Sequence, residues 1–216
     1  MANPKPGQPH ADPAWRWMGD RAVRVATGAA TLARYDLLAS GNFDEIEDVI
    51  PADGSILLVF RPGAEPSTRL RDALTRSVPE TPAATGREQV VRVAFGGEAG
   101  PDLARCAAQA GLDEAAYVQC LTAVDFTVAF LGFQPGFPYL AGLPEALAVP
   151  RRSTPRVRVA AGSVAVGGGY VGIYPAAGPG GWHVLGRSGA RLFDPAAAEP
   201  ALFRPGDRVR LVAESQ

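Results

Sequence analysis

The chain has 216 residues, of which 47% are hydrophobic and 20% charged, so it is long enough to bury a core in one large or two small domains. The formal net charge of -1 argues against a protein that binds nucleic acid or an anionic membrane, because such proteins usually carry a strong basic excess. Two cysteines, Cys106 and Cys120, without a CxxC pair argue against a disulfide framework and a structural zinc site.

The first segment, residues 1–14, is predicted to be a disordered tail. It contains four prolines and no apolar run, which distinguishes it from a signal peptide. No stretch approaches the roughly 18 consecutive apolar residues that a transmembrane helix needs. The expected location is therefore the cytoplasm, with neither a membrane nor a nucleic acid as partner.

Residues 15–95 alternate between strand-like and helix-like patterns. RAVRV predicts a strand, and a helix is expected to begin at Thr31 and to end near Gly41. EIEDVI and SILLVF flank the turn PADGS and predict a hairpin, after which Ser67 or Thr68 can start a second helix. After the proline-rich loop PETPAATG, VVRVAF predicts a further strand. This βαββαβ order predicts a ferredoxin-like N-terminal α/β domain over residues 15–95. The expected role of this domain is docking or structural framing, since its sequence shows no catalytic constellation.

Two short amphipathic helices are expected next. The first begins after Gly100, and the second begins at Asp113, a residue type that commonly caps helices. At helical spacing, their apolar positions include both cysteines, so both thiols are expected to be buried and inert. The helices are expected to cover the edge of the structure that follows.

From Phe126 to Val212 the sequence contains only short strand-like runs, which glycine and proline interrupt. This rhythm is typical of a barrel or a sandwich of β-strands. The prediction is an α+β protein whose second domain, residues 96–216, is a β-barrel with two leading helices.

A tempting motif in this region is GxGxxG at Gly167, Gly169 and Gly172. Dinucleotide-binding proteins need a helix immediately after this motif to hold the pyrophosphate, and here IYP follows instead. We therefore predict a glycine-rich bend between two strands. Ser163 does not lie in a GxSxG elbow, and His183 is the only histidine outside the tail, so a serine hydrolase triad is not expected.

The run PRRSTPRVR gives a clearer indication of a site. Arg151 and Arg152 lie between two prolines, on a loop of restricted shape that suits carboxylate or phosphate recognition, with surface solvation as the alternative. Arg156 and Arg158 alternate with valines and are expected to point into solvent from a strand.

The turn-rich segment QPGFPYLAGL adds polar groups to an aromatic surface. Gln134 and Tyr139 could rim a small-molecule cleft with the arginine loop, while Phe133 and Phe137 are expected in the core. His183 in PGGWH has two open interpretations, a packing or hydrogen-bonding role and a catalytic role.

Nine motifs in order make the chain resemble the KipI/PxpB family, whose PxpB members are the B subunit of 5-oxoprolinase, and which is also called allophanate hydrolase subunit 1 or carboxyltransferase subdomains C and D. They are GDRAV, GPDL, GFQPGFPYLAGLP, PRRSTPRVRV, AGSVAVGG, GIYP, PGGWHVLGR, LFDP and RPGDRVR. The resemblance implies an N-terminal α/β domain, a C-terminal cyclophilin-like β-barrel, and partners: an A subunit and a C subunit or KipA-like protein. It implies ATP-dependent opening of 5-oxo-L-proline to L-glutamate, with Mg and ATP bound in the complex and none held tightly by this chain alone.

The resemblance leaves two alternatives: a KipI-like inhibitor of a sensor histidine kinase, and the carboxyltransferase half of a biotin-dependent allophanate or urea-processing enzyme. Under the leading interpretation the chain is inactive alone, its catalytic residues are unassigned, and it holds no metal. Candidates for contacts to substrate or nucleotide are Arg151, Arg152 and Arg187 for anions, Gln134, Tyr139, Tyr174 and His183 as orienting groups, and Ser163 as a donor.

Four positions depart from the pattern of the family that the chain resembles. Where the family usually has a histidine, a proline, a threonine and a serine, this chain has Leu121, Ala160, Val171 and Gly178, respectively. These departures remove one imidazole and two hydroxyls close to the motifs expected to line a cleft.

Overall fold

The computed structural model describes residues 15–78 and 86–214. It divides the chain into two compact units, with the boundary between Thr85 and Gly86. The predicted tail at residues 1–14 and most of the predicted PETPAATG loop lie outside the described residues.

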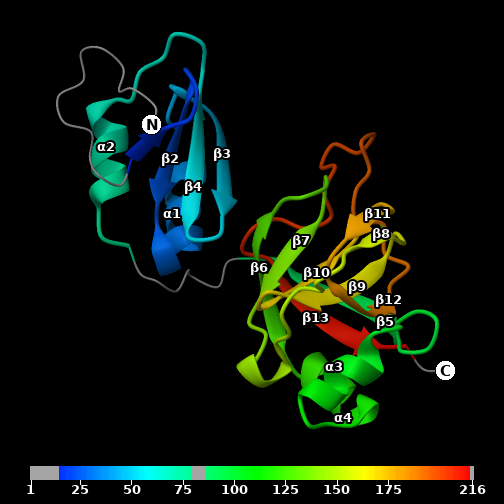
Figure 1. Cartoon of the computed structure of the whole chain (residues 1–216). Coiled ribbons are helices and arrows are strands. Elements are labelled where there is room, and N and C mark those ends of the chain that lie inside the picture. The colour runs from blue at the N-terminus through cyan, green and yellow to red at the C-terminus, as the bar shows by residue number, and fades with distance from the viewer. Residues whose placement is uncertain (1–14, 79–85, 215–216) are drawn as a thin grey trace. The chain divides into compact units, whose positions relative to one another are not determined.

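The N-terminal unit contains one antiparallel sheet in the order β1-β2-β4-β3 (Figure 1). Its strands are β1 (Trp15–Trp17), β2 (Ala22–Ala26), β3 (Ile46–Ala52) and β4 (Ser55–Phe60). The helices are α1 (Thr31–Ala39), which follows the 3-10 turn η1 (Gly28–Ala30), and α2 (Thr68–Thr75). Apolar residues of α1 and α2, including Leu38 and Leu70, share one core with the sheet residues Val23, Ile56 and Leu58. As predicted, the Ser67 hydroxyl caps α2 and accepts from the backbone N–H of Leu70 at 3.1 Å.

The predicted closing strand of this sheet belongs elsewhere. β5 (Glu88–Phe95) pairs with strands of the C-terminal unit, and β1 occupies the place beside β2. The ferredoxin-like order that this strand would complete, and the domain boundary after Phe95, were therefore wrong. The reason is burial: Val91 and Val93 are fully packed in the core of the second unit, and an alternating pattern does not specify which sheet a strand joins.

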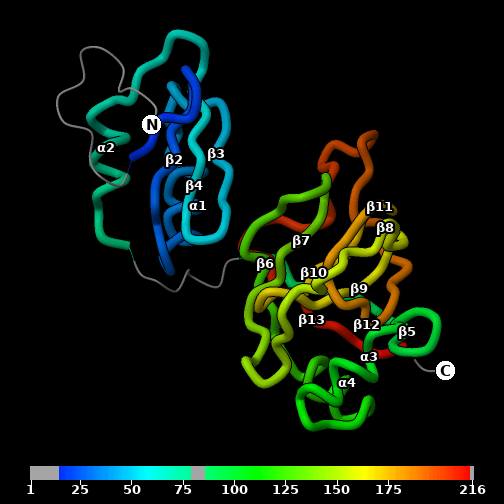
Figure 2. Tube along the Cα trace, viewed as in Figure 1, coloured from blue at the N-terminus to red at the C-terminus, as the bar shows by residue number. Residues whose placement is uncertain are grey.

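The second unit is a closed barrel of strands in the order β10-β7-β6-β13-β5-β12-β9, which confirms the expected β-rich barrel (Figures 1 and 2). The strands are β6 (Asp125–Leu131), β7 (Pro138–Ala141), β9 (Ser163–Gly167), β10 (Tyr170–Ile173), β12 (His183–Arg187) and β13 (Arg208–Ala213), together with β5. A separate antiparallel pair is formed by β8 (Arg156–Val159) and β11 (Gly178–Gly180), and a 3-10 turn, η2, spans Glu145–Leu147. The term cyclophilin-like stays an expectation from the resemblance.

Helices α3 (Leu103–Gln109) and α4 (Glu114–Thr122) pack side chains into the barrel core. Asp113 caps α4 as predicted, since its Oδ1 accepts from the N–H of Ala116 at 2.7 Å. Cys106 is buried, and burial raises the pKa of its thiol to about 11, which keeps it unreactive. Cys120 is exposed, contrary to the prediction, because Tyr117 and Leu121 define the buried stripe of α4 and Cys120 lies beside it.

The glycine-rich segment forms a bend, as predicted. Gly168 and Gly169 have φ angles of +63° and +85° and join β9 to β10 as a hairpin turn. Phe133 was expected in the core but is 58% exposed, at the tip of a turn where it adopts a φ of +66°. Phe137 is buried as expected.

Within the residues that the structure describes, no helix is long and apolar enough to cross a membrane. The same residues contain no grouping of three or more His, Cys, Asp or Glu side chains that could hold a metal ion.

Candidate functional site

A buried carboxylate, Asp102, ties the arginine loop to the barrel. It lies just before α3 and accepts from Nη1 and Nη2 of Arg156 at 2.7 and 2.8 Å and from Nη1 of Arg152 at 3.1 Å. It also accepts from the backbone N–H of Val184 on β12 at 2.7 Å. Burial acts to raise the pKa of Asp102, but the bonds from Arg156 and Val184 and the charges of both arginines outweigh it and hold that pKa below its ordinary value.

This arrangement corrects the expectation for Arg156. Its guanidinium is only about a quarter exposed and forms a bidentate pair with Asp102 instead of pointing into solvent. Sequence reasoning missed Asp102 because its position next to a proline at the start of a helix suggests a cap, and its partners are 50 and more positions away.

The backbone of the arginine loop is fixed at two further points. The N–H of Arg152 donates to the carbonyl of Gly181 at 2.8 Å, and Nε2 of His183 lies 3.1 Å from the carbonyl oxygen of Pro150. The loop therefore has a defined shape before any ligand arrives, which lowers the entropic cost of binding.

Beside the loop lies a cavity of about 280 Å³ between α3, the loop and the start of β12. Its lining residues are Arg105, Gln109, Pro150, Arg151, Arg152, Ser153, Thr154 and His183. Three cationic side chains and no acidic one line it. Among the residues that the structure describes, neither Arg105 nor Arg151 has an acidic partner within ion-pair distance. The cavity is therefore suited to an anion.

His183 is the buried polar side chain of this cavity, with only 3% of its surface exposed. Burial lowers the pKa of its imidazole; the charge of Asp102 opposes this shift, and Arg105 and Arg152 support it. Because a carbonyl oxygen can only accept, Nε2 carries the proton that it donates to Pro150, so Nδ1 of the neutral ring is an acceptor.

The lowered pKa of His183 predicts that acid destabilises the barrel. Between the folded-state pKa and the unfolded value of 6.5, the unfolded chain binds more protons, so the neutral ring's contribution is complete above pH 6.5 and is lost as the pH falls below it. We expect the free energy of unfolding, measured by urea titration, to decrease as the pH is lowered through this window. His183→Gln should flatten this slope, and an unchanged slope in that variant would contradict the assignment.

An aromatic cluster lies next to the cavity and shares Arg151 with it. The guanidinium of Arg151 lies 5.8 Å from the ring centroid of Trp182, and Tyr139 packs edge-on against Trp182 at 5.5 Å. Tyr139 also stacks on Phe130 at 4.3 Å. Burial raises the pKa of Tyr139, and the positive charge of Arg151 opposes that shift. Arg151 thus joins an apolar aromatic surface to a cationic pocket.

The structure places the predicted site residues in separate groups. Arg151, Arg152 and His183 line the cavity, whereas Tyr139 and Tyr174 belong to the aromatic cluster. Gln134 lies in the turn beside Gly178, where a Cβ would come within 2.7 Å of its Nε2.

Ser163 and Arg187 do not line the cavity. They face each other across β9 and β12, at the end of β12 opposite His183. The lining residues that sequence reasoning missed are Arg105, Gln109, Ser153 and Thr154. Ser153 and Thr154 directly follow the arginine pair in the sequence, and Arg105 and Gln109 have the i, i+4 spacing of one helix face. The sequence therefore contained a pattern that could have pointed to each of these two pairs.

Two of the departures from the family pattern do not lie in a cleft. Leu121 and Val171 are completely buried in the barrel core, where their apolar side chains pack without an unpaired polar group. The expected loss of cleft polarity at these two positions was therefore wrong. Ala160 is partly buried, and Gly178 leaves room for Gln134.

Comparison with known proteins agrees with this architecture. The family model described as carboxyltransferase domain, subdomain C and D, matches residues 13–203. The B subunit of 5-oxoprolinase from Escherichia coli O157:H7 is 44% identical over 176 residues, which cover 79% of this chain and 79% of that protein.

Solved structures show the same fold. The crystal structure of TTHA0988 superposes with a TM-score of 0.76 at 34% identity and covers 91% of this chain, which spans only 40% of the TTHA0988 chain. The Kluyveromyces lactis urea carboxylase gives a TM-score of 0.69 over 93% of this chain and 22% of its own, at 18% identity, which shows the fold alone.

Proposed function

The chain belongs to the family of carboxyltransferase domains, subdomains C and D, and from this premise we propose that it is the B subunit of an ATP-dependent 5-oxoprolinase. The observation that carries the proposal is the 44% identity to a 5-oxoprolinase B subunit over 79% of both chains. The cationic cavity beside the arginine loop supports it, because the substrate and the phosphates of ATP are anions.

The chemistry of the proposed reaction explains the need for ATP and for cationic groups. An unstrained lactam is a poor electrophile, and phosphorylation of its carbonyl oxygen by ATP turns that oxygen into a leaving group. Water then attacks the same carbon and the carbon–nitrogen bond breaks, which frees the amine and leaves an acyl phosphate. A second water attacks the acyl carbon, phosphate leaves, and the new carboxylate of L-glutamate results. Guanidinium groups at Arg105, Arg151 and Arg152 would balance the charge of the substrate and of the transferring phosphoryl group.

The proposal assigns the chain a supporting role in a complex with A and C subunits. The cavity supplies charge and hydrogen bonds, while its histidine is held to a backbone carbonyl. In the described part of the chain, no acidic cluster suits the magnesium of ATP, so no step is assigned to that metal here. Because ATP is the cosubstrate, the proposal includes a cytoplasmic location.

Reconstitution tests the proposal. The purified chain is mixed with its A and C partners, ATP and 5-oxo-L-proline, and the formation of L-glutamate and ADP is followed. We expect glutamate only when all subunits are present. Glutamate at background level with all subunits folded and assembled would reject the function.

Removing both loop arginines should reduce turnover strongly. In Arg151→Ala/Arg152→Ala the cavity loses two of its three cations, and we expect kcat/KM to fall by about 100-fold or more in the reconstituted complex. Arg158→Ala, which removes an exposed arginine from the neighbouring strand β8, is the matched control and should stay within about twofold of the parent. Equal activity of the double variant and the control would show that the loop arginines are not part of the functional site.

A carboxyltransferase role in a biotin-dependent enzyme is the second candidate, and the shared fold with urea carboxylase favours it. That role requires a biotinylated partner, which a streptavidin blot of the co-purified complex would reveal. A kinase-inhibitor role rests on the sequence resemblance alone, and recovery of a histidine kinase with slowed autophosphorylation would support it.

A further inference from the structure

The sheet of the N-terminal unit ends in an unpaired strand edge. β3 is the outermost strand of this sheet, and within residues 15–78 and 86–214 it pairs with β4 alone (Figure 1). A strand edge of this kind presents backbone groups that can pair with a strand from another protein. The proposed function places its anions at the cavity of the barrel unit and assigns no ligand to the N-terminal unit.

A groove of about 290 Å³ follows this edge between β3 and α1. Its aromatic and apolar lining includes Tyr35 and Leu38 of α1 and Phe43 of the connection to β3, and its other wall is formed by residues 46–49 of β3. Successive side chains of a strand point to opposite faces, so a groove that touches four successive residues lies along the edge of the sheet. A strand added to β3 would therefore also contact side chains of α1.

The backbone at this edge offers acceptors. The N–H of Val49 donates to Oδ1 of Asp48 at 2.8 Å, so the backbone groups of Val49 face away from β4. Alternate residues of an antiparallel strand face the same side, so the carbonyl of Pro51 also faces the free edge, and proline has no N–H. The carbonyl oxygens of Val49 and Pro51 are therefore available to a donor, and a ligand that pairs with them must supply N–H groups, as an extended peptide does.

The charge around the groove indicates what kind of peptide fits. Residues 35–60 include six acidic residues and neither lysine nor arginine. Asp48 has no cationic partner among the described residues, and Glu47 forms only an exposed pair with Arg21 at 2.9 Å, which contributes little to stability. A peptide that complements this charge is basic.

The two faces of β3 differ in polarity. Val49 packs against the core that α1 shares with the sheet, and Pro51 is buried, whereas Asp48 and Ile50 are exposed on the opposite face. A strand beside β3 has the same alternation of side chains. Its apolar residues would therefore face α1, and its basic residues would lie beside Asp48.

We propose that the N-terminal unit docks a basic, extended segment of a partner protein as an additional strand beside β3. The segment alternates apolar residues, which pack in the groove against α1, with lysine or arginine residues, which lie beside Glu47 and Asp48. Its backbone N–H groups donate to the carbonyls of Val49 and Pro51. This docking site is independent of the proposed function, because the groove and the cationic cavity belong to different units.

Fluorescence anisotropy of labelled peptides with the full chain tests the docking site. The first probe is the peptide Lys-Val-Lys-Val-Lys-Val-Lys, and the second has glutamate in place of each lysine. Two further probes are the basic peptide N-methylated either at its valine or at its lysine amides. We expect the acidic peptide to bind at least about tenfold more weakly than the basic one. At least one N-methylated peptide should lose a similar factor, because it cannot donate to the edge carbonyls.

A charge reversal locates the binding to the groove. Asp48→Lys should weaken binding of the basic peptide by about tenfold or more. Asp20→Lys is the matched control, since it makes the same charge change at an exposed acid in the turn between β1 and β2, and it should stay within about twofold of the parent.

Each outcome decides the inference. Absence of binding, or equal affinity for the basic and acidic peptides, overturns it. Full affinity of both N-methylated peptides rejects strand addition, and equal weakening by the two Asp variants rejects the groove as the site. If Asp48→Lys does not fold, the comparison of the four peptides on the parent chain decides. The peptides are tested without ATP or other subunits, so failure to bind leaves the proposed function intact, and binding does not support it.

Discussion

Asp102→Ala is expected to lower the free energy of unfolding of the barrel unit by about 3 kcal/mol, the low end of the cost of breaking a buried ion pair. The variant leaves the N–H of Val184 buried without its partner and removes the shared acceptor of Arg152 and Arg156. The low end applies because both guanidinium groups are about a quarter exposed and can recover part of their hydration.

The measurement is urea denaturation followed by tryptophan fluorescence, since Trp182 lies in the barrel. Asp113→Ala is the matched control: the same residue type is removed from an exposed cap of α4, and the expected cost is only about 1 kcal/mol. If both variants lose the same stability, Asp102 is not the link between the arginine loop and the barrel. Asp102→Ala should also weaken ligand binding in the cavity, because Arg152 loses the carboxylate that orients it.

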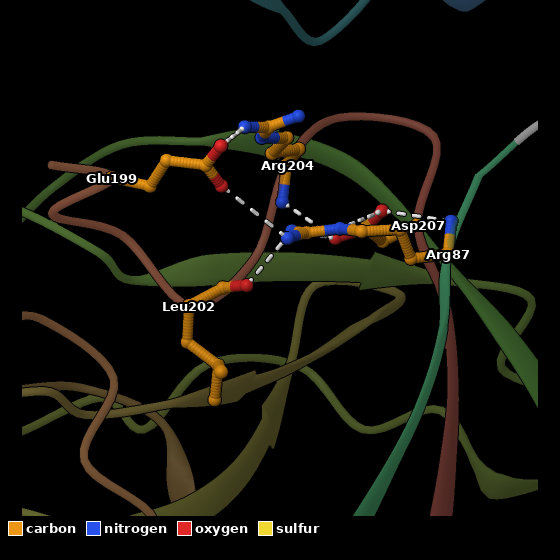
Figure 3. A network of polar contacts seen from close by, with 5 residues as sticks. All are labelled: Arg87, Glu199, Leu202, Arg204 and Asp207. Carbon is orange, nitrogen blue, oxygen red and sulfur yellow. Dashed lines mark hydrogen bonds and ion pairs between the residues drawn. The ribbon is translucent and has the colours of Figure 1, made fainter.

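Asp207→Ala is expected to cost about 3 kcal/mol for a different reason. Figure 3 shows its buried carboxylate accepting from the backbone N–H groups of Arg87 and Arg204, at 3.0 and 2.8 Å, and from the guanidinium of Arg87 at 2.7 Å. Alanine would leave two backbone donors without partners, and each buried unsatisfied donor costs about 1–3 kcal/mol. The guanidinium is 40% exposed and contributes less, because water can replace the carboxylate.

The same denaturation assay, together with hydrogen exchange at the paired strands β5 and β13, checks this prediction. We expect the amide protons at the start of β5 to lose protection first, because Asp207 fixes Arg87 directly before that strand. Glu199→Ala removes an exposed acid that pairs with Arg87 and Arg204 in the same network and should cost less than about 1 kcal/mol. A comparable loss in both variants would mean that Asp207 acts only through surface charge.

Local chemistry explains what the sequence could determine. The caps at Ser67 and Asp113 and the bend at Gly168 and Gly169 depend on neighbours within a few positions, and all were predictable. The rigid loop around Arg151 was recognisable as a candidate for the same reason, since two flanking prolines restrict its backbone.

Contacts between distant segments explain what only the tertiary structure decided. The alternation of β5 fits either sheet, and its parallel pairing with β13, about 120 positions later, places it in the barrel. Asp102 can bind both the arginines and the backbone of Val184 only because folding brings it to Val184, 82 positions away. Closure of the barrel likewise places Leu121 and Val171 in its core. Residue type and spacing therefore defined the local elements and the cationic loop, whereas closure of the barrel decided which side chains share the cavity, because it depends on the packing of the whole second unit.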